Sequence, residues 1–237
     1  MNLRVAMTMG IFLAVPSVHS PTPQPTADEI VSQMETMSQE RAATPEKISC
    51  DRTYTLDYRG FPESKHAEVK VHLLQDGSRK EINILSESGS SVLRAKVLHR
   101  IIDTEHDASL GKLHEESLLN SKNYEFNIVN TEQSADGVLY ILAVRPRTKS
   151  KVAWSGRIWV DGTDYAVIRA EGQPDSMPSW WTTHSDFIST YQKVGSAWVA
   201  KQNVSDTHIR FGGHAHLVIE SENCSLIGHE HAEVKTP

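Results

Sequence analysis

The sequence lacks the short motifs that mark the common catalytic sites. G-x-S-x-G, H-E-x-x-H and the phosphate-binding P-loop are all missing, and no two carboxylates can be nominated as general acid and base. Cysteine is rare as well: Cys50 and Cys224 occur without any C-x-x-C pair, which argues against redox catalysis. We therefore expect a protein that is not an enzyme and that needs no cofactor.

Positive charge and long apolar runs are also scarce. The 237 residues carry 24 basic and 30 acidic side chains, a net charge of −6, and the isoelectric point is near 6.0. This balance argues against nucleic acid or an anionic membrane surface as the main partner. After residue 20, no apolar run approaches the roughly 20 residues that a transmembrane helix needs, so we expect a soluble protein with one main domain.

Residues 1–20 have the pattern of a secretory signal peptide. One positive charge, Arg4, precedes an apolar run from Val5 to Val15, which is followed by Pro16 and small residues. No cysteine follows the run, so a lipid-anchored form is not expected. Cleavage would remove Arg4 and leave a net charge of 23 − 30 = −7. A proline-rich linker at 21–25 comes next, and a polar tail is expected at 227–237.

A first helix is predicted after the linker. Thr26 and Glu29 fit a capping box, and an apolar stripe follows at Ile30, Met34 and Met37. The stripe has two interpretations: it packs into an ordinary core, or its flexible methionines form a lid over a variable apolar ligand.

Most of the remaining chain alternates with a period of two. Runs at 54–58, 67–73 and 82–84 predict one antiparallel meander, and runs at 138–144, 154–160 and 165–170 predict another, with an Asp161-Gly162 turn in the second. Glu68, Lys70 and Lys80 are assigned to a solvated face of the first meander. Helical spacing returns at 91–106, residues 107–121 stay unassigned, and further strands are expected at 124–128, 186–194, 197–204, 207–211 and 214–221.

About ten or eleven strands and two helices exceed what one flat sheet holds comfortably. We therefore predict a mainly β (α+β) fold: a strongly curved antiparallel sheet or unclosed β-barrel, with helices covering its concave face.

Several segments resemble the outer-membrane lipoprotein-sorting family, the LolA-like periplasmic carriers, and most closely its divergent branch outside the proteobacteria. The resemblance covers most of 26–226 and implies an unclosed barrel that shelters lipid acyl chains in the periplasm. Two features depart from the family: the chain is longer, and the sequence does not identify the arginine that the best-known carriers use against their lid. The segments are ADEIVSQM at 27–34, NYEF at 123–126, GRIWVDGTDYAVIRAEG at 156–172, FISTYQKVGSAWVAKQ at 187–202 and HLVIESENC at 216–224.

An acyl chain needs a dry apolar concavity, because removal of apolar area from water supplies the affinity. The alternative is that the same residues fill an ordinary core. The candidate lining residues are Tyr54, Leu56, Tyr58, Val69, Val71, Ile82, Ile84, Trp154, Ile158, Phe187, Tyr191 and Trp198.

Three smaller features allow two interpretations each. Trp180 and Trp181 either fold back onto the sheet rim, which we favour, or form an exposed pair that contacts a partner or a membrane interface. Cys50 and Cys224 are either bridged or two free thiols.

The twelve histidines include His214 and His216 on one strand face, and His229 and His231 in the tail. No carboxylate or thiolate partner has a recognisable spacing to them, so we interpret them as surface residues and predict no metal site.

We predict a monomeric periplasmic carrier of lipoprotein or lipid acyl chains, with an inner-membrane donor and an outer-membrane acceptor as possible partners. Two other hypotheses stay open. One is a periplasmic sensor that binds lipid or misfolded protein and regulates an envelope response. The other is a metal-dependent hydrolase on an unrelated β fold.

Overall fold

The computed structural model describes residues 24–134, 137–177 and 180–227. The expected signal peptide at 1–20 lies outside these ranges, as do residues 21–23 of the expected linker and 228–237 of the expected tail. Every helix within the described ranges is too short or too polar to cross a lipid bilayer.

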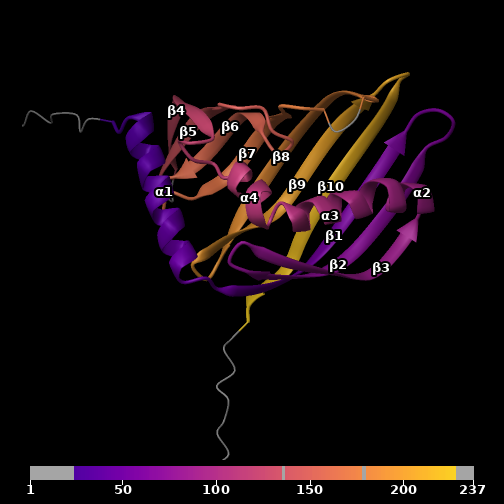
Figure 1. The fold of residues 1–237 in the computed structure, drawn as a ribbon, viewed down its shortest axis with the longest axis horizontal. Helices are drawn as coiled ribbons and strands as arrows, with labels where there is room; N and C mark the ends of the chain where they lie inside the picture. Colours follow the sequence, from indigo (N-terminus) through magenta and orange to yellow (C-terminus); the bar gives the residue numbers. More distant parts are fainter. Residues whose placement is uncertain (1–23, 135–136, 178–179, 228–237) are drawn as a thin grey trace, which may run out of the picture.

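Ten antiparallel strands form one curved, open sheet (Figure 1). The spatial order is β3-β2-β1-β10-β9-β8-β7-β6-β5-β4, so β3 and β4 are its two edges. The predicted curved antiparallel sheet with helices on one face is therefore confirmed. The strands are β1 (Lys47–Arg59), β2 (Lys65–Asp76), β3 (Arg79–Gly89), β4 (Tyr124–Ser134), β5 (Gly137–Pro146), β6 (Trp154–Asp161), β7 (Val167–Pro174), β8 (Thr182–Val194), β9 (Ala197–Ile209) and β10 (Gly213–Leu226).

The first and last strands of the chain, β1 and β10, lie side by side in the middle of the sheet. Cys50 on β1 and Cys224 on β10 form a disulfide, with an S–S distance of 2.11 Å. The bridge closes a loop across 174 positions of sequence. On the loop-entropy model, such a closure stabilises the folded chain by on the order of 5 kcal/mol at most.

Helices cover the concave face at two places (Figure 1). Helix α1 (Ala27–Ala43) begins at the predicted capping box, in which the Glu29 amide donates to Thr26 Oγ1 and the Thr26 amide donates to Glu29 Oε2. It stands beside β4 to β7. Helices α2 (Ser91–Leu93), η1 (Arg94–Leu98) and α3 (His99–Asp107) continue one another across β1 and β2, and α4 (Gly111–Ser117) follows.

The predicted meander over 138–170 is confirmed as β5, β6 and β7. The runs at 197–204 and 207–211 are one strand, β9, and not two. Ser205 and Asp206 join the two runs. Both residues pair with β8 on one side and β10 on the other, and these two ladders keep the strand continuous. Residues 107–121, which the sequence left unassigned, contain α4.

Candidate functional site

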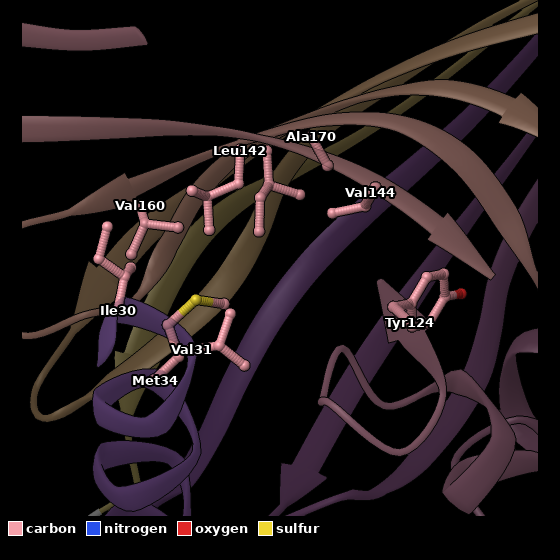
Figure 2. Close-up of a cluster of buried hydrophobic side chains, with 9 residues drawn as sticks. Ile30, Val31, Met34, Tyr124, Leu142, Val144, Val160 and Ala170 are labelled. Atoms are coloured by element: carbon pink, nitrogen blue, oxygen red, sulfur yellow. The ribbon is translucent and has the colours of Figure 1, made fainter. Parts of the chain in front are cut away.

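Beneath α1 lies a cluster of nine buried side chains, here called the α1 cluster (Figure 2). Three of them come from one face of the helix and six from β4, β5, β6 and β7. The inward side chains of neighbouring strands converge on the helix because cross-strand partners share a face of the sheet. The members are Ile30, Val31, Met34, Tyr124, Leu142, Val144, Ile158, Val160 and Ala170.

Helix α1 is held to the sheet mainly by this apolar packing. Ile30 and Met34 are at most 5% exposed, while Met37 of the predicted stripe is half-buried. Two hydrogen bonds supplement the packing: Arg41 Nη1 donates to the Asp164 carbonyl at 3.0 Å, and the Ser121 amide donates to Glu35 Oε1 at 2.6 Å.

A cleft of about 310 Å³ opens between α1 and the segment that follows α4. Met34 belongs both to its wall and to the α1 cluster, so the cleft leads directly to buried apolar side chains. Its apolar lining is Met34, Leu118, Leu119, Tyr165 and Val167, and its polar lining is Glu35, Ser38, Gln39, Asn120, Ser121 and Lys122.

Tyr124, in the same cluster, is 1% exposed. Burial is the main influence on its hydroxyl and raises the pKa of that group, which therefore stays protonated.

A second group of buried side chains, here called the α3 cluster, lies under η1 and α3. Leu98 and Ile102 from the helical segment pack against inward residues of β1 and β2, and Ala215, Leu217 and Ile219 of β10 pack at its side. The buried members are Tyr54, Leu56, Ala67, Val69, Val71, Leu98 and Ile102.

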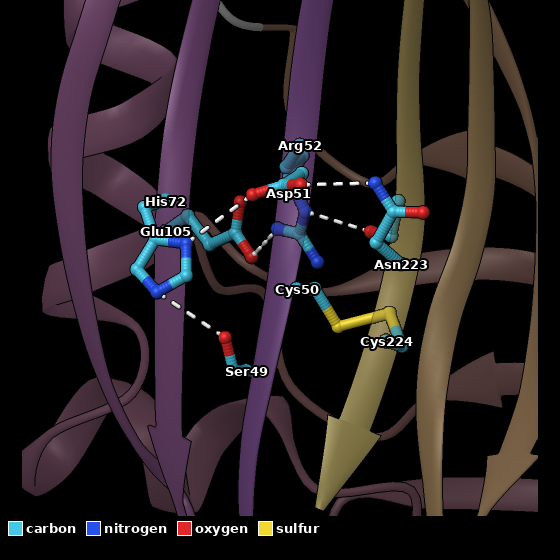
Figure 3. Close-up of a disulfide and its surroundings, with 9 residues drawn as sticks. Ser49, Cys50, Asp51, Arg52, His72, Glu105, Asn223 and Cys224 are labelled. Carbon is cyan, nitrogen blue, oxygen red and sulfur yellow. Dashed lines mark hydrogen bonds and ion pairs between the residues drawn. A yellow bond between two sulfur atoms is a disulfide. The ribbon is translucent and has the colours of Figure 1, made fainter. Parts of the chain in front are cut away.

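Charged side chains fasten this helical segment to the sheet, in an arrangement here called the Glu105 latch (Figure 3). Glu105 of α3 accepts hydrogen bonds from Arg52 Nη1 at 2.5 Å, Lys80 Nζ at 2.7 Å and the Tyr54 hydroxyl at 2.8 Å. Arg52 is 4% exposed, and its Nε donates to Ser221 Oγ at 2.9 Å.

Electrostatics favour the charged form of Glu105 despite its burial. Burial alone would raise the pKa of Glu105, but the positive charges of Lys80 and Arg52 outweigh it and lower the pKa to about 2. Burial also raises the pKa of the Tyr54 hydroxyl, which therefore stays protonated and donates to Glu105. The latch is a paired, hydrogen-bonded ionic site.

The Glu105 latch was not predicted from the sequence. Lys80 was assigned to the solvated face, but it lies on the covered face with Ile82, and its side chain reaches Glu105. The spacing of two already placed Lys80 with Ile82, and Arg52 with Tyr54. Arg52 thus lies against a covering helix, α3, to which its hydrogen bond with Glu105 connects it.

A row of small polar side chains separates the two clusters, here called the polar seam. Ser205 of β9 pairs with Phe187, which packs on the α1 cluster, and with Leu217, which packs on the α3 cluster, so all three share the concave face. Within the seam, Asn203 Nδ2 donates to Ser189 Oγ at 2.6 Å, and Ser185 Oγ lies 2.9 Å from Thr207 Oγ1. Its members are Ser185, Ser189, Asn203, Ser205 and Thr207.

The predicted lining residues fall into two separate buried clusters and do not all belong to one of them. Two sets fall on opposite sides of the seam, and three residues lie outside both clusters. Ile84 is 48% exposed, the Tyr58 hydroxyl donates to the Phe61 carbonyl, and Trp198 Nε1 donates to Asp164. The α3 side holds Tyr54, Leu56, Val69, Val71 and Ile82, and the α1 side holds Trp154, Ile158, Phe187 and Tyr191.

Trp180 and Trp181 form an exposed pair at the sheet rim, where Trp181 also lies next to Phe211, so features of both interpretations are present. They are 65% and 44% exposed, and their rings cover each other, with centroids 3.8 Å apart. Mutual stacking buries part of each ring, which explains why both can stay at the surface.

His214 and His216 both face Asp206, with Nε2 and Nδ1 at 3.3 and 2.8 Å from Asp206 Oδ1. Asp206 is a carboxylate neighbour that the sequence analysis did not find. No three histidine, cysteine or acidic side chains in the described ranges are grouped so as to hold a metal ion. His229 and His231 lie outside those ranges.

No protein-family model and no curated protein matches the chain. Among solved structures, it is similar to a DUF1329 family protein of Desulfovibrio piger, with 12% identity, a TM-score of 0.41, and coverage of 90% of this chain and 96% of that one.

Two further structures have comparable similarity. A LolA superfamily protein of Nitrosomonas europaea has 11% identity, a TM-score of 0.36 and coverage of 86% and 95% of the two chains. A Vibrio parahaemolyticus domain assigned to outer-membrane lipoprotein sorting has 13% identity, a TM-score of 0.40 and coverage of 84% and 94%. The likeness is remote, and it includes the family that the sequence resembles.

Proposed function

We propose that this protein is a periplasmic carrier that holds acyl chains of lipoproteins or other lipids between α1 and the sheet, without catalysing a reaction. One observation supports the proposal above the others: the cleft beside α1 opens onto the α1 cluster, so apolar surface continues from solvent into the core. Donor and acceptor partners at the inner and outer membranes belong to the same proposal.

The size and lining of the cleft suit an acyl chain whose binding moves α1. A volume of about 310 Å³ is at the lower end of small-molecule sites, which span roughly 300–1,000 Å³. A longer chain therefore needs the helix to shift. Met34 and Met37 are unbranched and flexible, so they can repack around chains of different length.

The attachment of the two helical covers makes α1 the candidate lid. Apolar contacts between α1 and the sheet can be exchanged for contacts with an acyl chain at little net cost, because both are non-directional. A lipid tail has no charged group that could replace the ion pairs and hydrogen bonds of the Glu105 latch. We therefore expect ligand to enter beneath α1 while α3 stays docked.

A pair of valine substitutions tests the proposal. Val167 lines the cleft and is half-buried, whereas Val160 is fully buried in the same cluster. Val167→Phe should fill the cleft, weaken binding of a fluorescent fatty acid about tenfold, and leave the urea midpoint nearly unchanged. Val160→Phe, the matched control, should instead cost about 1–3 kcal/mol of stability by overpacking.

Equal effects of the two substitutions on stability would contradict a vacant cleft. A carrier must also release its ligand, so lipopeptide bound to the protein should pass to outer-membrane vesicles. Retention of the lipopeptide under every condition would favour the sensor hypothesis over the carrier.

A further inference from the structure

Three connections at one end of the sheet carry exposed aromatic side chains, here called the aromatic rim: Phe61, Trp180, Trp181 and Phe211. Phe61 follows β1, the tryptophans precede β8, and Phe211 lies in the β9–β10 turn. Phe61 and Phe211 are 87% and 86% exposed, so almost none of either ring contributes to the core. Packing in the hydrophobic core therefore does not explain why aromatic residues occupy these positions.

The rim is a continuous feature. Trp181 lies next to Phe211, with ring centroids 6.1 Å apart, and Trp180 stacks on Trp181. The Phe61 connection touches the Phe211 turn, because a Cβ placed on Gly60 would lie 2.9 Å from the Gly213 Cα. The three loops that carry these rings thus lie together at one end of the sheet.

Phe211 occupies a backbone position that phenylalanine disfavours. Its φ is +68° and that of Gly212 is +86°, the combination found in type I′ turns, where asparagine followed by glycine is preferred. A bulky residue in the left-handed region is costly, and this ring gains no packing in return. Strain of this kind is expected where a side chain has a use outside the folded core.

Two arginines flank the rim. Arg210 Nε donates to the Trp180 carbonyl at 2.8 Å, and the Arg210 amide donates to the Trp181 carbonyl at 2.8 Å, so the tryptophan pair is fixed to the end of β9. Arg59, at the end of β1, is exposed, and its side chain has no hydrogen bond or ion pair with the described residues. Guanidinium groups beside aromatic rings match the phosphates and the apolar layer of a lipid headgroup region.

We propose that the aromatic rim docks this protein onto the surface of a lipid bilayer, with the four rings inserted at the headgroup boundary and Arg59 and Arg210 near phosphates. The rings stand on protruding loops, and a protein partner would need a matching groove for each of them, whereas a bilayer accommodates them without one. Because the net charge of the protein is −6, the rings and not long-range attraction must drive docking. The inference goes beyond acyl binding and does not require an occupied cleft.

Flotation with vesicles tests the proposal. The full chain should bind vesicles of phosphatidylcholine, and also vesicles that include phosphatidylglycerol. Phe211→Asn should weaken binding about tenfold without loss of stability, because asparagine suits the turn. The double variant Trp180→Ser with Trp181→Ser should weaken binding at least as much, and brominated lipids should quench tryptophan emission in the parent but not in this variant.

Two controls make the result decisive. Leu85→Asn removes an apolar side chain that is 63% exposed on β3, away from the rim, and should leave vesicle binding unchanged. Val167→Phe alters the cleft and should also dock normally, so docking and acyl binding fail separately. Unchanged flotation of folded Phe211→Asn and double-tryptophan variants would overturn the proposal, as would absence of binding by the parent chain.

Discussion

The two ends of the covered face are closed by different kinds of contact. Over β4 to β7, α1 places Ile30, Val31 and Met34 on apolar side chains. Over β1 and β2, α3 adds to its apolar contacts a buried carboxylate, Glu105, that accepts three hydrogen bonds, two of them from cations. The polar seam lies between these two arrangements and separates their apolar surfaces.

This difference indicates which cover can move. The free energy gained by apolar packing is proportional to the buried area and requires no fixed direction of contact. A ligand can therefore replace the contacts of α1. A buried ion pair resists separation, because opening it leaves a charge in a poorly solvated place. We infer that the sheet has a fixed cover at α3 and an exchangeable one at α1.

Glu105→Leu should produce the largest effect. The substitution leaves Arg52, 4% exposed, without its carboxylate, and loss of one partner of a buried pair typically costs about 3–5 kcal/mol. The urea midpoint measures the loss. The double variant Arg52→Leu with Glu105→Leu removes both charges and should be more stable than Glu105→Leu alone. Equal stability of the single and double variants would show that Arg52 does not depend on Glu105.

Acid should loosen the α3 end by the same mechanism. The pKa of Glu105 is lowered to about 2, below its ordinary value near 4.3, so its contribution is complete above about pH 5 and is lost as pH falls toward 2. The loss amounts to on the order of 3 kcal/mol. Between pH 6 and about pH 2.5, the free energy of unfolding of the parent should fall more steeply than that of Glu105→Gln, which cannot titrate at this position. Parallel curves for the two proteins would contradict the assignment.

Local patterns in the sequence were sufficient to predict the sheet. Period-two runs and the Asp161-Gly162 turn identify the meander from β5 to β7, and Thr26 with Glu29 identifies the start of α1. The curved architecture follows from strand number and from helices that need an apolar face.

The candidate site was harder to predict because it depends on contacts distant in sequence. Arg52 and Lys80 share a face with Tyr54 and Ile82, but an isolated charge there has no interpretation until Glu105 is placed opposite it. The seam depends on strand pairing that the sequence does not specify: Ser185 pairs with Thr207 and Ser189 with Asn203 only once β8 and β9 are in register. The mutual stacking of Trp180 and Trp181 was not predicted because it depends on loop geometry.

Met34→Glu should have the smallest effect on global stability. Its effect should be confined to α1, so it distinguishes the cover at α1 from the one at α3. A carboxylate in the α1 cluster has no partner there, so α1 should detach from the sheet. The loss of protein stability should not exceed the free energy by which α1 packs on the sheet, about 2 kcal/mol. Amides of α1 should then exchange quickly with deuterium, while those of α3 and the sheet stay protected. Binding of an apolar dye should rise as the cluster becomes accessible.

Two matched variants decide whether this behaviour belongs to α1 alone. Gln33→Glu introduces the same group on the exposed side of α1 and should change neither exchange nor dye binding. Leu98→Glu places it in the α3 cluster, where Leu98 is 0% exposed, and should lower the urea midpoint of the whole domain because the latch ties that helix to β1 and β3. If Met34→Glu also abolished the β-sheet signal in circular dichroism, Met34 would be part of a single cooperative core. The cover at α1 would then be as fixed as the one at α3, and the carrier proposal would lose its lid.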